Sequence, residues 1–397
     1  MRARTAARPL LLSGLLIAVL AIIVAFCLEW LPFEPADLPL QLRNKDVANY
    51  WMAGKLSLEG KASLLFGSPQ AYFEAMKSVF GNDYPWHNWS YPPHAALFLI
   101  PLGLLDFLPA MALFLGLTLA LYLVALATFE ARWSPMAGLL LLPFVVANLV
   151  ATQNGFLTAA LLIAGLSLRD RNPVLAGVLF GILTFKPQLG FLLPVLLLVE
   201  GRWRVIAAAA VTMALLVLLS LLVFGASSWD GYFAIVAPYQ TEVMNTLDGD
   251  FPFMMGSAFG AARSYGLDAD AAFLVHLPFA AAGAALLLLA LRKVADFHAR
   301  AFATLLATLV ISPYSVAYDF GAVATFAALW PMAARSEAAP AHLRITMPLV
   351  AILPIAMLPL GQVGLPLTPV VLLAALGALL ASEDTFKRPS RPNPATP

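Results

Sequence analysis

A few acidic, basic and amide side chains interrupt an otherwise apolar chain, and they are the candidates for chemistry. Asp46 lies in the longest polar interval, residues 31–93, and is followed by Tyr50 and Trp51. Positions four apart share one face of a helix, so the carboxylate of Asp46 is expected beside an aromatic surface. A carboxylate can take a proton from a hydroxyl group, and aromatic rings commonly contact sugars and lipids. The alternative is a helix N-cap, or a surface acid beside Lys45.

A basic and an acidic residue appear at two further interruptions. Lys186, in Lys186-Pro187-Gln188, follows a short apolar run, and Pro187 ends the helix so that the ammonium group could hold a phosphate. The structural alternative is a lysine that extends to the membrane surface from a helix end. Tyr318-Asp319 follows another broken run. Asp319 could position an acceptor, balance a donor cation, or form an ion pair with Lys186.

Amide and histidine side chains complete the candidate set. Gln153 and Asn154 occur together at a turn between apolar runs, where their amides suit sugar hydroxyls or a helix cap. His94 could contact a phosphate or a sugar, or lie at the membrane interface with the aromatic residues that precede it. The histidines are too few and too irregularly spaced for a metal site, so neither a metal nor a cofactor is predicted.

The composition defines the class of protein that must position these residues. Of 397 residues, 61% are hydrophobic and 11% are charged, which is far from the composition of a soluble domain. Apolar runs of about twenty residues recur along the chain, long enough to cross a bilayer as helices. The sequence therefore predicts an all-α integral membrane protein, a polytopic helical bundle surrounded by membrane lipids. A net charge of +1 and the lack of a basic tract argue against a nucleic-acid partner.

The apolar runs predict the domain organisation. We expect one transmembrane domain at 1–381, with the outer loop 31–93 carrying Asp46, and a short disordered cytoplasmic tail at 382–397. His94 to Leu105 is expected to re-enter the bilayer as a half-span. Several spans are too short to cross the bilayer in full. The domain has about twelve expected spans, near residues 9–30, 108–129, 135–151, 155–168, 173–185, 188–200, 205–224, 271–291, 302–316, 320–334, 345–361 and 365–381.

The distribution of positive charge orients the chain. With the N-terminus in the cytoplasm, 16 of the 23 lysines and arginines fall at cytoplasmic ends. Ionisable residues at membrane depth are costly and commonly mark a site. We therefore expect an active site on the extracytoplasmic side of the plasma (inner) membrane. The residues placed on that side are Asp46, Gln153, Asn154, Lys186, Gln188, Tyr314, Tyr318 and Asp319.

Five short strings can be compared with a known family. They are Asp46-x-x-x-Tyr50-Trp51, Tyr91-Pro92-Pro93 with Pro101-Leu102, Gln153-Asn154-Gly155-Phe156-Leu157-Thr158, Lys186-Pro187-Gln188-Leu189-Gly190, and Ser312-Pro313-Tyr314 with Tyr318-Asp319. In order, spacing and membrane side, the chain from Asp46 to Asp319 resembles the GT-C class of membrane glycosyltransferases, specifically glycosyltransferase family 87. That family includes polyprenol-phosphate-mannose-dependent mannosyltransferases.

The resemblance implies an inverting hexosyltransferase. Its donor would be a polyprenyl-phosphate-linked sugar, with mannose as the first choice, and its acceptor a hydroxyl group of a lipid or glycan. Asp46 matches the acid that serves as general base, and Lys186 is the first choice for the leaving phosphate, ahead of His94 and Arg263. Such donors need no nucleotide fold and no obligatory metal. The candidate substrate contacts are Tyr50, Trp51, His94, Gln153, Asn154, Lys186, Gln188, Tyr318 and Asp319.

Two other classes of membrane protein are the alternatives. A polytopic transporter would place polar residues at mid-depth and usually has related halves, and neither feature is evident in this sequence. A lipid-carrier flippase shares the lipid substrate, but arginines would more often line its central cavity. The long first outer loop and the one-sided polar residues favour the glycosyltransferase.

Overall fold

The described part of the chain is helical. The computed structural model describes residues 45–129, 134–247, 249–333 and 340–382. These residues form no strand, only an isolated bridge between Met255 and Val316, and the predicted all-α class is confirmed for them. The α-helices are α3 (Val47–Leu58), α4 (Pro69–Phe80), α5 (Pro93–Leu97), α6 (Phe107–Leu126), α7 (Pro135–Ala151), α8 (Gly155–Leu168), α9 (Pro173–Leu183), α10 (Leu193–Val199), α11 (Trp203–Phe224), α12 (Ala226–Gly231), α13 (Ala237–Asn245), α14 (Ala258–Ser264), α15 (Ala269–Lys293), α16 (Phe297–Ile311), α17 (Gly321–Ala333), α18 (Ala341–Gln362) and α19 (Thr368–Ala381).

The expected count of about twelve spans is not confirmed. Among the described helices only α6, α11, α15 and α18 are long and apolar enough to cross a membrane. The 14 residues of α8 and the 11 of α9 reach only about 21 Å and about 17 Å, against a hydrocarbon core of about 30 Å. The run at 188–200 contains a short 3₁₀ turn and then the seven-residue α10. The expected span at 9–30 and all of the expected tail except Ser382 lie outside the described residues.

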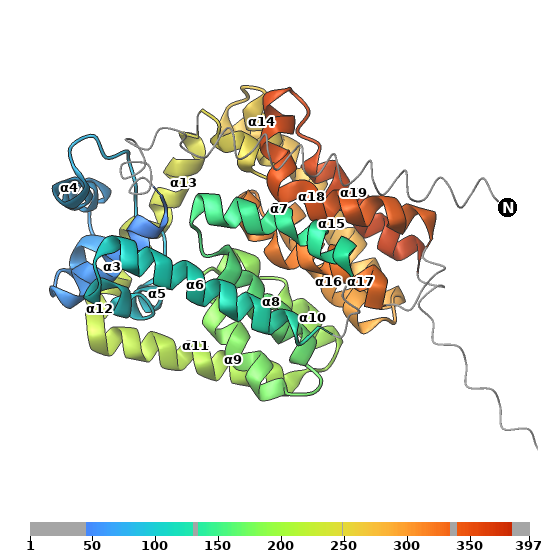
Figure 1. The fold of residues 1–397 in the computed structure, drawn as a ribbon, viewed down its shortest axis with the longest axis horizontal. Helices are drawn as coiled ribbons and strands as arrows, with labels where there is room; N and C mark the ends of the chain where they lie inside the picture. Colours follow the sequence, from blue (N-terminus) through green and yellow to red (C-terminus); the bar gives the residue numbers. More distant parts are fainter. Residues whose placement is uncertain (1–44, 130–133, 248, 334–339, 383–397) are drawn as a thin grey trace, which may run out of the picture.

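The helices form two packed groups that meet at α7 and α8 (Figure 1). In one group, α6 packs on α8, α8 on α9 and α9 on α11. In the other, α15, α16 and α19 pack together, and α18 packs on α17 and α19. α7 contacts α17 and α18, and α17 also contacts α8. Helices α3, α5 and α12 gather at one end of the first group, and α13 leads from that end toward α14.

Two glycines fix α3, the helix that follows Asp46. α3 packs on the 3₁₀ segment η2 (Ile100–Leu104) with their backbones in contact. A Cβ atom on Gly54 would lie 2.2 Å from the carbonyl oxygen of Leu99, and one on Gly103 would lie 2.5 Å from the amide nitrogen of Lys55. Only glycine permits this approach, because real Cβ atoms do not come so close to backbone atoms. The position of α3 therefore depends on both residues.

Gly54→Ala is expected to destabilise the protein by about 1–3 kcal/mol, because overpacking against backbone cannot be relieved by a change of rotamer. Thermal unfolding of the purified protein in detergent measures the effect. Gly116→Ala in α6 is the matched control, since no atom lies within 4 Å of its added Cβ. Equal unfolding temperatures for Gly54→Ala and wild type would show that α3 does not depend on this contact.

Candidate active site

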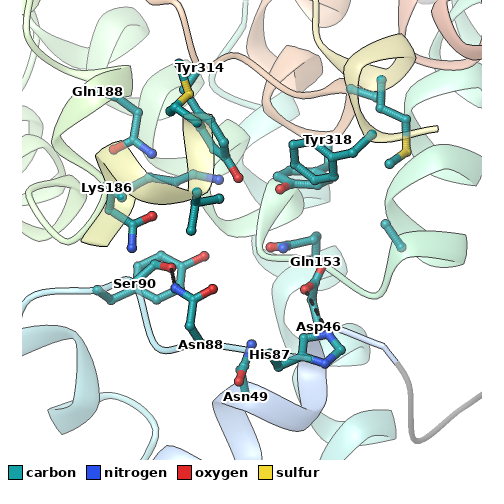
Figure 2. Close-up of a pocket in the computed structure, with 18 of the residues that line it drawn as sticks. Asp46, Asn49, His87, Asn88, Ser90, Gln153, Lys186, Gln188, Tyr314 and Tyr318 are labelled. Carbon is teal, nitrogen blue, oxygen red and sulfur yellow. Dashed lines mark hydrogen bonds and ion pairs between the residues drawn. The ribbon is translucent and has the colours of Figure 1, made fainter. Parts of the chain in front are cut away.

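A cavity of about 990 Å³ lies where the polar connections between helices meet. Its wall comprises the start of α3, residues 86–92, the end of α7, the link after α9, part of α13 and the segment after it, the link between α16 and α17, and α18. Figure 2 shows Asp46 and His87 on one side of this space and Lys186 and Tyr314 on the other. A carboxylate and an ammonium group thus border the same space.

Asp46 occupies the N-cap position of α3, but its carboxylate is not used as a cap. The side chain makes no cap hydrogen bond, so the N-cap alternative does not account for it. The side chain is 35% exposed and lines the cavity. Tyr50, one turn further along α3, lines the cavity too, as the i to i+4 spacing predicts. The carboxylate is therefore accessible to a hydroxyl group in the cavity.

Two basic side chains lie beside Asp46. His87 Nε2 is 3.8 Å from Asp46 Oδ1, and His87 Nδ1 is 3.3 Å from the carbonyl oxygen of Pro85. A carbonyl oxygen only accepts, so Nδ1 carries the hydrogen in that contact and Nε2 faces the carboxylate. Burial lowers the pKa of Lys45, and the neighbouring Asp46 charge opposes that shift. His87 thus lies against Asp46 and also lines the cavity.

A directed chain of hydrogen bonds joins three residues of the cavity wall, Tyr50, Tyr91 and Gln153, to Asn154 behind it. The Asn154 amide nitrogen donates to the Tyr91 hydroxyl at 2.9 Å, and the Tyr91 and Tyr50 hydroxyls are 3.0 Å apart. Tyr50 in turn donates to Gln153 Oε1. Burial raises the pKa of both Tyr50 and Tyr91, so each phenol keeps its proton and the chain stays intact. These contacts join α3, the 86–92 segment and the turn between α7 and α8.

Lys186 is held in a buried ion pair. Its ammonium group donates to Asp319 Oδ1 and, at 3.2 Å, to Asn154 Oδ1, and it lies 4.9 Å from the centre of the Tyr318 ring. The side chains of Lys186 and Asp319 are 4% and 0% exposed. Asp319 also accepts from the Val316 amide at 3.4 Å. The pairing of Asp319 with Lys186, one of the alternatives left open by the sequence, is present in the structure.

The predicted site residues separate into two sets. Six of them line the cavity: Asp46, Tyr50, Gln153, Lys186, Gln188 and Tyr318. Asn154 and Asp319 lie just behind that lining and contact Lys186. The other two, Trp51 and His94, lie elsewhere: Trp51 Nε1 donates to the Leu105 carbonyl at 2.8 Å, and His94 stacks on Trp229 and contacts Thr184. Arg263, a weaker candidate, donates to backbone carbonyls of residues 245, 247 and 267.

Several cavity residues were not predicted from the sequence. They are neutral amide, hydroxyl and indole side chains of segments whose apposition depends on tertiary packing, namely Asn49, Trp86, Asn88, Ser90, Tyr239 and Gln240. Asn49 had a usable signal, since it lies between Asp46 and Tyr50 on one helix. Its Oδ1 accepts from Tyr72 at 2.8 Å, which fixes the amide.

A metal site would need several ligating side chains close together. Nowhere in the described ranges do three or more His, Cys, Asp or Glu side chains come together in that way. Among the lining residues the polar groups that could interact with a ligand are one carboxylate, two ammonium groups, a histidine, an indole, amides, phenols and two aliphatic hydroxyls. Such a set can take a proton from a hydroxyl group and hold an anion.

Comparison with known protein families identifies the class of enzyme. The family model described as glycosyltransferase family 87 matches residues 89–313, more than half of the chain. The chain belongs to glycosyltransferase family 87. Members of family 87 are glycosyltransferases, so this protein is an enzyme that moves a sugar from a donor to an acceptor. No curated protein and no solved structure matches the chain.

The family 87 match covers only part of the candidate site. His94, Gln153, Asn154, Lys186 and Gln188 lie inside the matched residues. The other candidates lie outside them, and they are Asp46, Tyr50, Trp51, Tyr318 and Asp319. The family 87 match therefore does not test the prediction that Asp46 is the general base.

Proposed function

We propose that this family 87 enzyme moves a hexose, with mannose as the first choice, from a polyprenyl-phosphate carrier to an acceptor hydroxyl of a lipid or glycan. The reaction takes place on the extracytoplasmic side of the plasma membrane, in a single transmembrane domain at 1–381. Asp46 is the general base, and Lys186, held by Asp319 and Asn154, faces the leaving phosphate. Tyr50, Gln153, Gln188 and Tyr318 contact the substrates from the cavity wall.

The proposed step is a direct displacement. Asp46 takes the proton of the acceptor hydroxyl while the oxygen attacks the anomeric carbon from the face opposite the phosphate. The new bond joins the acceptor oxygen to the sugar. The bond between the anomeric carbon and the phosphate oxygen breaks, and its electron pair leaves with the lipid phosphate. Configuration at the anomeric carbon inverts, and Asp46 later releases its proton to water.

The observation that carries this proposal is that a carboxylate and an ammonium group border one cavity from opposite sides. Asp46 lies on one side and Lys186 on the other. An apolar part of the wall, formed by Ala147, Val150, Pro354 and Leu358 of α7 and α18, suits a lipid-linked substrate.

The small net charge of the site favours a sugar donor that carries one phosphate. The ammonium groups of Lys45 and Lys186 are balanced by the carboxylates of Asp46 and of Asp319, which contacts Lys186 just behind the wall. A nearly neutral site suits the single negative charge of a sugar phosphodiester better than the several charges of a diphosphate.

A panel of donors tests the proposal. Purified enzyme in lipid vesicles is given mannosyl or glucosyl polyprenyl phosphate, or the corresponding nucleotide sugars, together with host membrane extract as acceptor. We expect labelled product from a lipid phosphate donor and none from a nucleotide sugar. Transfer from a nucleotide sugar alone would overturn the proposed donor, and the enzyme would remain a glycosyltransferase.

A further inference from the structure

The link between α16 and α17 places two tyrosines beside Lys186. Figure 2 shows the hydroxyl groups of Tyr314 and Tyr318 pointing toward one another and toward the end of the Lys186 side chain. All three side chains line the cavity. The three polar groups therefore converge on one part of the wall, opposite Asp46.

The backbone that carries the two tyrosines is tightly held. The Ser257 hydroxyl donates to the Pro313 carbonyl at 2.6 Å, and the Gly256 amide donates to the Ser315 carbonyl at 2.7 Å. The carbonyl oxygen of Tyr318 would lie 2.3 Å from a Cβ atom on Gly155, so α8 also packs closely against this link. Side chains on such a fixed backbone are pre-organised for binding.

The three groups have more hydrogen-bond donors than the protein uses, although Tyr314 and Tyr318 also share a side-chain hydrogen bond with each other. An ammonium group has three N–H donors. Within the described ranges, Asp319 and Asn154 accept from two of those on Lys186. Burial raises the pKa of Tyr314, so its phenol keeps its proton and stays a neutral donor. Asp319 balances the Lys186 charge, so the site has several hydrogen-bond donors but little net charge.

We infer that Tyr314 and Tyr318, together with Lys186, form the binding site for the single phosphate of the lipid-linked donor and of the lipid phosphate product. This inference rests on the proposed function. The phenol O–H groups and the ammonium N–H groups donate to the phosphate oxygens, and no further positive charge is needed to bind a monoanion. The two tyrosines thus select a single phosphate and hold it so that the anomeric carbon faces Asp46.

The test is binding of farnesyl phosphate, a short-chain analogue of the product, to wild type and to Tyr314→Phe, Tyr318→Phe and the double variant. Each lost hydrogen bond to an anion is expected to weaken binding by about tenfold, and the double variant by about a hundredfold. Farnesol, which lacks the phosphate, should bind all four proteins equally. Tyr265→Phe is the control, because that hydroxyl bonds to the Gly364 carbonyl away from the cavity.

Two further ligands separate recognition of the single phosphate from recognition of the lipid chain. Inorganic phosphate tests binding of the head group without a lipid chain. Farnesyl diphosphate tests whether the site selects one phosphate over two. Wild type should bind farnesyl phosphate more tightly than either of these ligands. Unchanged affinity of the double variant for farnesyl phosphate would overturn the role of the tyrosines, while transfer by wild type from a lipid phosphate donor would leave the proposed function standing. If wild type neither binds farnesyl phosphate nor uses such a donor, the proposed function itself fails.

Discussion

Asp46→Asn is expected to lower the rate of sugar transfer by about 10²- to 10⁴-fold, the usual contribution of a general base. The amide has nearly the size of the carboxylate but cannot accept the acceptor proton. Because the Asp46 side chain makes no cap hydrogen bond to α3, its replacement should leave folding almost unchanged. Initial rates at saturating donor, with thermal unfolding of the same samples, measure both effects.

Asp106→Asn is the matched control for this substitution. Asp106 also occupies an N-cap, that of α6, without a side-chain cap bond, and it is exposed and absent from the cavity lining. Its replacement should leave transfer at the wild-type rate. Retention of most activity by Asp46→Asn would exclude Asp46 as the base, even if Lys186 proved essential.

The second large effect concerns the buried pair of Lys186 and Asp319. Lys186→Met should destabilise the protein by about 3–5 kcal/mol, because the Asp319 carboxylate would lose its charged partner while remaining buried. Sugar transfer should be lost in the same variant. Denaturant unfolding in detergent measures the stability, and donor-dependent turnover measures the activity.

A double substitution separates folding from chemistry at this pair. Lys186→Met combined with Asp319→Asn removes both charges, so most of the lost stability should return while transfer stays absent. Wild-type turnover by the double variant would remove Lys186 from the leaving-group site. Wild-type stability of Lys186→Met alone would contradict the buried pair.

The sequence predicted much of the helical framework because long apolar runs have few alternatives in a membrane. Each expected run within the described ranges contains helix, but run length did not predict which helices could cross. For example, the expected span at 188–200 begins within a 3₁₀ turn, and only the seven residues of α10 form an α-helix in it. The short helices α8 and α9 depend on neighbours that no local pattern reveals.

The site residues that the sequence predicted correctly are those with a distinctive side chain or a regular helical spacing from one. The i to i+4 rule placed Tyr50 with Asp46, whereas Trp51, one residue further, points to the Leu105 carbonyl and the rings of Phe80 and Phe107. Polar turn residues such as Gln153 and Lys186 stood out against an apolar background. Asn88 and Ser90 carried no such contrast in the polar interval, and only the packing of the 86–92 segment brings them to the cavity.

The most direct test of the central claim follows a ¹³C-labelled sugar from a polyprenyl-phosphate donor in vesicles that contain the wild-type enzyme and host acceptor. We predict that the label appears on the acceptor and that its anomeric configuration, read by NMR, is opposite to that in the donor. Label that stays on the lipid carrier, or that crosses the bilayer still attached to it, would contradict sugar transfer from this donor. Label on the acceptor with retained configuration would contradict direct displacement with Asp46 as base.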